Sequence, residues 1–382
     1  MRASHRVLSV LAFMAAAGAA LSSCGTKDTA AVIVPTDLPG LQSVGLHQVW
    51  QRQVPLESGE RITKVWRLGL SMYVATSGCR IVRLDAKSGI LKWGVGLGYE
   101  NFDIFRPVEL KGPDGFPNHE VLVVTRGEAF IFNVDIGDEL RRGRMGISVS
   151  TDPVVIGNTL CVGGADTFYG MYMDRLGMKR WRIPEPGDLF VSTPLAMDNN
   201  VLVASKRGKL WRISADSGDW DWKDRKTNGD ILGGLAADFN ALYVPCEDQR
   251  VYAFRTDSGG ELWEQQLDNR LEETPAMGGP VVLVRSVDNK LSALARTSGA
   301  IRWSKTGISQ VATVNEETVW VADAADNIRL LDLETGEEKA AAPAGGIEYF
   351  VLNSADQNVI LVTHAGLIGM YSPSAQNAKE SD

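Results

Sequence analysis

The ten residues "LARTSGAIRW" (294–303) combine the end of a strand, a Thr-Ser-Gly turn and a tryptophan four residues after the glycine. Nearly the same phrase recurs in "FRTDSGGELW" (254–263) and in "LDAKSGILKW" (84–93). Glycine supplies the positive φ that such turns need, and Ser or Asp side chains can bond the turn backbone. A phrase that recurs in one chain indicates an internal repeat.

Two landmarks give the repeat the same period. The turn glycines recur about every 41 residues, at Gly89, Gly137, Gly177, Gly218, Gly259, Gly299 and Gly336. Prolines keep that spacing in "STDP" (150–153), "VSTP" (191–194) and "EETP" (272–275). Tryptophans occupy the strand after the turn at Trp50, Trp93, Trp181, Trp222, Trp263 and Trp303. Two copies are degenerate, with 140–142 and Ala340 near the tryptophan position. We expect these aromatics to pack between neighbouring repeats.

One repeat, residues 233–267, contains four short apolar or alternating stretches separated by turn signals. Four antiparallel strands in about 40–45 residues, repeated radially, are typical of a β-propeller. The sequence therefore predicts an all-β fold, an eight-bladed β-propeller of four-stranded antiparallel blades. Residues 358–373 supply strands of a last blade, and the N-terminal strand 45–54 supplies the outermost strand that it lacks. The alternatives are a seven-bladed ring and an open solenoid, which would need atypical capping repeats.

The N-terminal segment predicts export and lipid attachment. Residues 1–23 combine Arg2 and Arg6 with a short apolar run, as in a signal peptide. "LSSC" (21–24) resembles a bacterial lipobox, which predicts acylation of Cys24 as the new N-terminus. A conventional signal peptide or a short membrane anchor is the alternative. We expect a lipidated N-terminus and flexible tether over 24–44, the propeller over 45–373 and a disordered tail over 374–382.

Charge and composition exclude several classes of function. The net charge of −8 disfavours nucleic-acid binding, which needs a basic stripe. It also disfavours adhesion to anionic lipid, so we expect membrane attachment through the lipid anchor alone. Neither a metal site nor a catalytic constellation is predicted, because the histidines share no ligand spacing. The remaining cysteines, Cys79, Cys161 and Cys246, are interpreted as small buried or half-buried thiols, and no cofactor is expected.

The Gly-xxx-Trp signature resembles the PQQ-like, or quinoprotein-type, propeller repeat. Together with the lipobox, it makes the chain resemble the BamB family of outer-membrane lipoproteins. This resemblance implies a non-enzymatic scaffold, lipid-anchored at the outer membrane and facing the periplasm. Such a scaffold would assist the assembly and insertion of outer-membrane β-barrel proteins, with the β-barrel assembly machinery as its envelope partner. The alternative is a propeller that binds PQQ or another ligand, possibly linked to redox chemistry.

The resemblance also implies a partner-binding patch on two inter-blade loops. Leu189 and Phe190 lie in the first loop, "PEPGDLFVSTP" (184–194), where the family's arginine is missing. Asp230 lies in the second loop, "KTNGDILGG" (226–234), and Leu232 replaces the family's second acid.

A third candidate comes from a departure from the repeat. Gly89 and Gly137 are 48 residues apart, and the excess falls in 99–120. Tyr99, Phe102, Phe105 and Arg106 in this segment are of types enriched in binding hot spots. The alternative is that its aromatics fill the gap between the first two blades.

Overall fold

The computed structural model describes residues 39–98, 103–112 and 115–373, all within one compact unit, Asp37–Asp382. The predicted signal peptide, Cys24 and the predicted tail lie outside the described residues. Within those residues, no helix is both long and apolar enough to cross a membrane.

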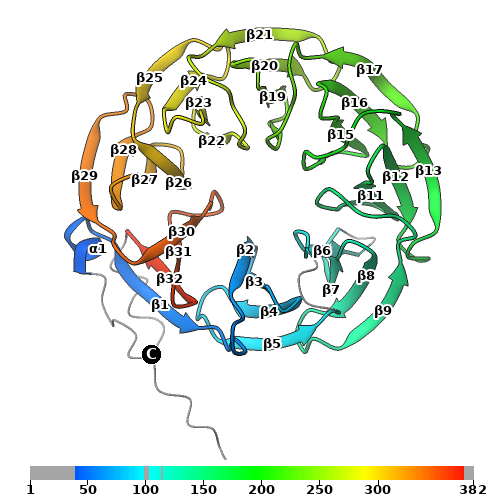
Figure 1. Cartoon of the computed structure of the whole chain (residues 1–382), viewed down its shortest axis with the longest axis horizontal. Helices are drawn as coiled ribbons and strands as arrows, with labels where there is room; N and C mark the ends of the chain where they lie inside the picture. The colour runs from blue at the N-terminus through cyan, green and yellow to red at the C-terminus, as the bar shows by residue number, and fades with distance from the viewer. Residues whose placement is uncertain (1–38, 99–102, 113–114, 374–382) are drawn as a thin grey trace, which may run out of the picture. The chain divides into compact units, whose positions relative to one another are not determined.

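The described residues form eight four-stranded antiparallel sheets arranged as the blades of a ring (Figure 1). The prediction of an eight-bladed all-β propeller is therefore confirmed. Blade one consists of β2 (Ile62–Leu68), β3 (Ser71–Thr76), β4 (Arg80–Asp85) and β5 (Leu91–Gly96), and blade two of β6 (Val108–Lys111), β7 (Pro117–Val124), β8 (Glu128–Asn133) and β9 (Glu139–Arg144). Blade three consists of β10 (Val154–Ile156), β11 (Thr159–Gly163), β12 (Thr167–Tyr172) and β13 (Lys179–Pro184). Blade four consists of β14 (Leu195–Met197), β15 (Asn200–Ala204), β16 (Lys209–Ser214) and β17 (Trp220–Lys226).

Blade five consists of β18 (Ala236–Ala237), β19 (Ala241–Pro245), β20 (Arg250–Arg255) and β21 (Glu261–Gln266), and blade six of β22 (Ala276–Gly278), β23 (Val281–Arg285), β24 (Leu291–Ala295) and β25 (Ile301–Lys305). Blade seven consists of β26 (Ile308–Val314), β27 (Thr318–Asp323), β28 (Asn327–Asp332) and β29 (Glu338–Pro343). Blade eight consists of β30 (Ile347–Val351), β31 (Val359–Thr363) and β32 (Leu367–Ser372), together with β1 (His47–Gln53). The one helix in the described residues is α1 (Pro39–Ser43).

The strand sequences explain where the core lies. The second strand of a blade is mainly apolar and buried, and β19 is buried along its whole length, because neighbouring blades cover both of its faces. The outermost strand alternates, and in β25 only Trp303 is buried. Apolar clusters fill the interfaces between successive blades, so the hydrophobic core is distributed around the ring.

The ring is closed by the N-terminal strand. β1 runs antiparallel to β32 and pairs from His47 opposite Ser372 to Gln53 opposite Leu367. The last blade thus has the spatial order β1-β32-β31-β30, and its outer strand comes from the opposite end of the described chain. This closure covers the edge that an open array would expose. It excludes the open solenoid and the seven-bladed ring for this structure.

Each repeat tryptophan joins its blade to the next. The indole Nε1 of Trp263 donates to the carbonyl oxygen of Arg296 at 2.9 Å, and its ring lies against Gly299 of the following blade. A Cβ on Gly299 would be 2.5 Å from the Trp263 ring, and its φ is +72°. Glycine therefore serves both the turn and the close approach of the indole. The same indole-to-carbonyl bond is made by Trp50, Trp93, Trp181, Trp222 and Trp303.

The two degenerate repeats are completed by different side chains. At the tryptophan position of blade two, Arg141 donates from Nη1 to the carbonyl oxygen of Met173 in blade three, at 3.2 Å. At that position of blade seven stands Ala340, and helix α1 packs against β29. Leu41 of α1 is completely buried there. Residues 39–43, which the sequence assigned to the tether, are thus part of the folded body, because Leu41 packs in the apolar cluster that contains Ala342 of β29.

Candidate functional site

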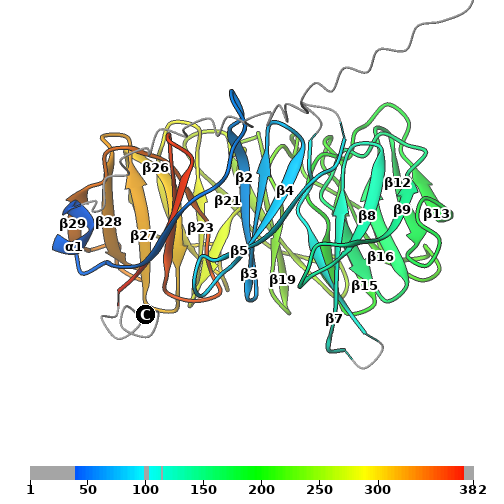
Figure 2. The ribbon, with the colours of Figure 1, turned by 90° about the horizontal axis from the view of Figure 1, so that it is seen from below.

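The inter-blade loops and the turns between second and third strands share one face of the ring, called here the loop face. Figure 2 views the ring edge-on, with the β1–β2 connection at its upper edge. Loops 184–194 and 226–234 are inter-blade connections, as are residues 103–107 of the third candidate segment (99–120), and so they contribute to the loop face. Loops on a rigid repetitive frame are where binding residues usually lie.

The two loops singled out by the family resemblance meet at the β15–β16 turn. The backbone N–H of Lys206 donates to the carbonyl oxygen of Leu189, and the N–H of Ile231 donates to that of Lys206, both at 2.6 Å. The ammonium of Lys206 is 3.9 Å from the carboxylate of Asp230. Leu189 is 44% exposed, and Leu232 is half-buried. These contacts bring separate loops into one continuous patch.

The patch, called here the blade-four surface, comprises Leu189, Lys206, Arg207, Asp230 and Leu232. The backbone N–H of Arg207 donates to the carboxylate of Asp188, which fixes the turn, while the Arg207 side chain is exposed. Lys206 and Arg207 were missed in the sequence. Their only signal was the "KRG" turn (206–208) between two strands, and only the fold places that turn beside the predicted loops. Loop 184–194 contains no arginine, but Arg207 lies close to it on the β15–β16 turn.

Phe190 is a correction. The sequence placed it beside Leu189 as an apolar partner contact, but its side chain is fully buried. Its ring lies 5.6 Å from that of Phe168 and 5.7 Å from that of Trp211, between blades three and four. In this irregular segment Leu189 faces solvent and Phe190 enters the core.

The third loop is also only partly available to a partner. Phe105 was proposed as a contact, yet it is buried in the cluster between blades two and three, whereas the alternative had placed it in the gap between blades one and two. Arg106 is exposed. Tyr99 and Phe102 lie outside the described residues, so their role stays a prediction.

Asp152 links the third loop to the first. Its carboxylate accepts a bond from the backbone N–H of Arg106 at 2.9 Å and another from the hydroxyl of Thr193 at 3.2 Å. Asp152 and Thr193 hold equivalent positions before the repeat's proline. The three loop segments are therefore held in a fixed relation across blades two to four. A fixed relation suits binding, because less conformational freedom is lost on association.

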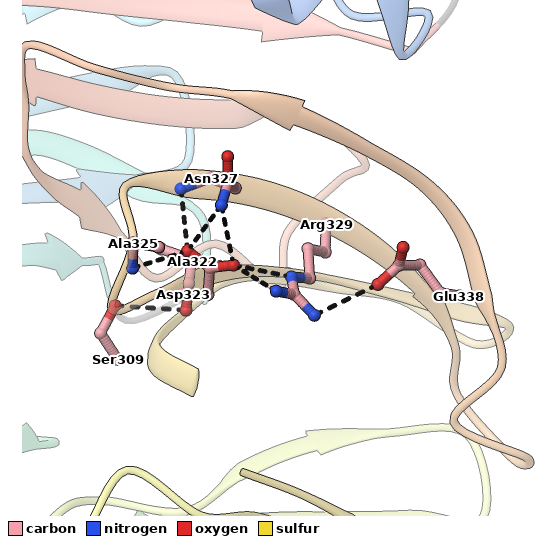
Figure 3. A network of polar contacts seen from close by, with 7 residues as sticks. All are labelled: Ser309, Ala322, Asp323, Ala325, Asn327, Arg329 and Glu338. Atoms are coloured by element: carbon pink, nitrogen blue, oxygen red, sulfur yellow. Dashed lines mark hydrogen bonds and ion pairs between the residues drawn. The ribbon is translucent and has the colours of Figure 1, made fainter. Parts of the chain in front are cut away.

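A buried carboxylate on blade seven is a second place where chemistry could be sought. Asp323 accepts bonds from the backbone N–H groups of Ala325 and Asn327, both at 2.9 Å, and from Nε of Arg329 at 2.8 Å (Figure 3). Arg329 in turn reaches Glu338 on the outer strand at 3.3 Å. Burial alone would raise the pKa of Asp323, but these bonds hold it below its usual range. An ionised carboxylate with its acceptor sites occupied stabilises the β27–β28 turn and is poorly suited to proton transfer.

Thiols and metal-binding clusters are a third place where chemistry could be sought. Cys79, Cys161 and Cys246 are all buried free thiols on different blades. Burial raises the pKa of Cys161 to about 12, so this thiol is not poised as a nucleophile. Across residues 39–98, 103–112 and 115–373, no group of three His, Cys, Asp or Glu side chains could hold a metal ion.

Known proteins resemble the chain in sequence and in fold. The family model described as outer membrane protein assembly factor BamB matches residues 225–361. The protein of that name from Burkholderia pseudomallei is 27% identical over 118 residues, which cover 31% of this chain and 30% of the relative. The one from Bordetella pertussis is 23% identical over 289 residues, covering 61% of this chain and 72% of the relative. The chain spans about a third of the length of the first relatives that it matches.

The crystal structure of BamB from Moraxella catarrhalis superposes with a TM-score of 0.68 at 16% identity, covering 86% of this chain and 97% of that one. At this identity the likeness establishes the fold. Sequence and structure together confirm the resemblance to BamB that the repeats predicted.

Proposed function

We propose that this BamB-like propeller is a non-enzymatic scaffold of the bacterial envelope, which assists the assembly and insertion of outer-membrane β-barrel proteins. Cys24 would carry the lipid anchor, and the ring would face the periplasm. The observation that carries the proposal is the use of the repeat residues: tryptophans, glycines and the buried Asp323 all serve inter-blade packing or turns. Because these residues serve the fold, we look for function in the exposed residues of the loops.

The blade-four surface is the proposed docking site for the partner, which we take to be a subunit of the β-barrel assembly machinery. It combines an exposed leucine with charges of both signs on loops that are hydrogen-bonded to one another. An apolar anchor surrounded by polar groups is typical of protein interfaces. Because Phe190 is buried, Leu189 and Leu232 supply the apolar contact, and Arg207 supplies a cation.

The proposal is tested by cross-linking and affinity capture of the lipidated protein from envelopes, comparing Leu189→Asp with wild type. We expect the variant to fold and to lose capture of the assembly machinery, because a carboxylate would replace the apolar anchor. Leu262→Asp is the matched control, since Leu262 is 42% exposed but lies on the outer strand β21. Equal capture by both variants would contradict the docking site. Failure of the wild-type protein to capture any machinery subunit would contradict the function.

A further inference from the structure

A cavity lies between the inner strands of the first and last blades, away from the blade-four surface. Its volume is about 320 Å³, and it is lined by β2, by β30 and by Arg106. Three of its lining residues are cations, Lys64, Arg67 and Arg106, and none is an acid. This volume lies in the range of small-molecule sites, roughly 300–1,000 Å³.

Two of the residues that line this cavity carry buried donors with no partner among the described residues. The donors are Nε and Nη1 of Arg67 and the hydroxyl of Tyr349. Buried polar atoms in folded proteins are nearly always hydrogen-bonded, so each exception needs an explanation. Five such atoms occur in the described residues; three belong to Arg67 and Tyr349, on neighbouring strands that line the same space, and the others belong to Asp188 and Arg212. Such a concentration indicates a site that is completed by a bound group with acceptor atoms.

The guanidinium of Arg67 is fixed from one side only. Its Nη2 is 2.5 Å from Oδ2 of Asp356 in the β30–β31 connection. Burial alone would raise the pKa of Asp356, but the bond from Arg67 and those from Asn358 and Asn353 hold it below its usual range. Asp356 therefore stays ionised and balances the charge of Arg67. Nε and Nη1 of Arg67 are buried and keep no partner among the described residues.

Lys64 supplies a charge that no acid balances. Its ammonium reaches the carbonyl oxygen of Ile104 at 3.5 Å, and it takes part in no ion pair within the described residues. Burial, followed by the nearby charge of Glu348, raises the pKa of Tyr349, so its hydroxyl remains a neutral donor at physiological pH. The cavity thus combines a guanidinium edge, a hydroxyl donor and a net positive charge.

We propose that this cavity binds a small oxyanion, the carboxylate or phosphate group of a small molecule. The free edge of Arg67 would hold two of its oxygens or share one, since a guanidinium matches both groups in geometry. Tyr349 donates a further bond, and Lys64 supplies the balancing charge. The site is independent of the proposed scaffold role, because it lies between β2 and β30 and uses none of the blade-four residues.

The test uses the chain that follows Cys24, which contains the whole compact unit. Isothermal titration calorimetry measures the binding of inorganic phosphate in one arm and of succinate in the other, at constant ionic strength set with sodium chloride. We expect saturable binding in at least one arm, and the arm that binds identifies the ligand group. Lack of binding in both arms would overturn the proposal.

Tyr349→Phe assigns the binding to the cavity. The variant should fold with undiminished thermal stability, because it removes a buried hydroxyl that has no protein partner. Its affinity for the ligand should fall about tenfold or more, the usual effect of losing a hydrogen bond to a charged group. Lys64→Gln should lower affinity as well, and it carries the test if Tyr349→Phe does not fold. Tyr172→Phe, on blade three, is the matched control, and unchanged affinity in both cavity variants would refute the site.

Discussion

Replacing Gly299 with alanine tests the contact that repeats around the ring. A Cβ at this position would lie 2.5 Å from Cε3 and 2.7 Å from Cδ2 of Trp263. The indole cannot easily withdraw, because its Nε1 is bonded to the carbonyl oxygen of Arg296 and its other side packs against Tyr243. The φ of +72° adds a second penalty, since alanine rarely adopts this conformation.

Two terms set the size of the effect. Placing alanine at positive φ costs about 1–2 kcal/mol. Forcing an extra methyl group into a packed contact costs about 1–3 kcal/mol more. We therefore expect Gly299→Ala to lower the free energy of unfolding by about 2–5 kcal/mol. Gly307→Ala is the control, because its φ is +78° and nothing lies within 4 Å of its added Cβ. Gly307→Ala should therefore lower the free energy of unfolding only by the cost of placing alanine at positive φ, about 1–2 kcal/mol.

The assay is equilibrium urea unfolding of wild type and both variants, followed by far-UV circular dichroism so that Trp263 is not itself the probe. The free energies of unfolding of Gly299→Ala and Gly307→Ala should differ by the cost of forcing the methyl group against the indole, about 1–3 kcal/mol. Adding Trp263→Ala to Gly299→Ala should cost less than the sum of the single changes, because the clash then disappears. Equal destabilisation by Gly299→Ala and Gly307→Ala would show that the indole contact does not constrain the repeat.

Two further changes address the departures from the repeat. Arg141→Ala should lower the free energy of unfolding by about 1 kcal/mol, because it removes the bond to Met173 that joins blades two and three; an unchanged urea midpoint would contradict that role. Asp323→Asn should cost about 1.5–3 kcal/mol at pH 7, since it removes the charge that Arg329 bonds. The lowered pKa of Asp323 contributes stability above the unfolded value of about 3.9 and loses it as pH falls through the folded value. The difference from wild type should therefore narrow below about pH 4, and urea curves at pH 7 and pH 3 that keep it constant would argue against this assignment.

The fold could be predicted from the sequence because its determinants are local and repeated. Gly299 and Trp303 are four residues apart, and each phrase of this kind marks one hairpin of one blade. Closure could also be predicted, because the last repeat lacks an outer strand and residues 45–54 supply one. Arg141 and helix α1 could not be predicted in their roles. A single arginine has no periodicity, and a five-residue helix gives no stripe from which its packing could be inferred.

The candidate site was predictable in location but not in composition. The loops of 184–194 and 226–234 do meet on one face, through Lys206. Which side chains face solvent depends on the direction of each Cα–Cβ bond in an irregular segment, and no pattern in the sequence encodes this. Leu189 and Phe190 are both apolar and adjacent, yet one is exposed and the other fills the core between two blades. The cavity between β2 and β30 joins residues about 280 positions apart, so only the closed ring creates it.

The central claim, that the N-terminal strand completes the last blade, is tested most directly by hydrogen exchange. The amide groups of β31 and β32 would be compared in a chain beginning at residue 39 and in one beginning at residue 54. The account predicts that loss of β1 removes the neighbour of Leu367–Ser372 and sharply lowers the protection of these amides, while blade four stays protected. Unchanged protection of β32 in the shorter chain would contradict closure of the ring by β1.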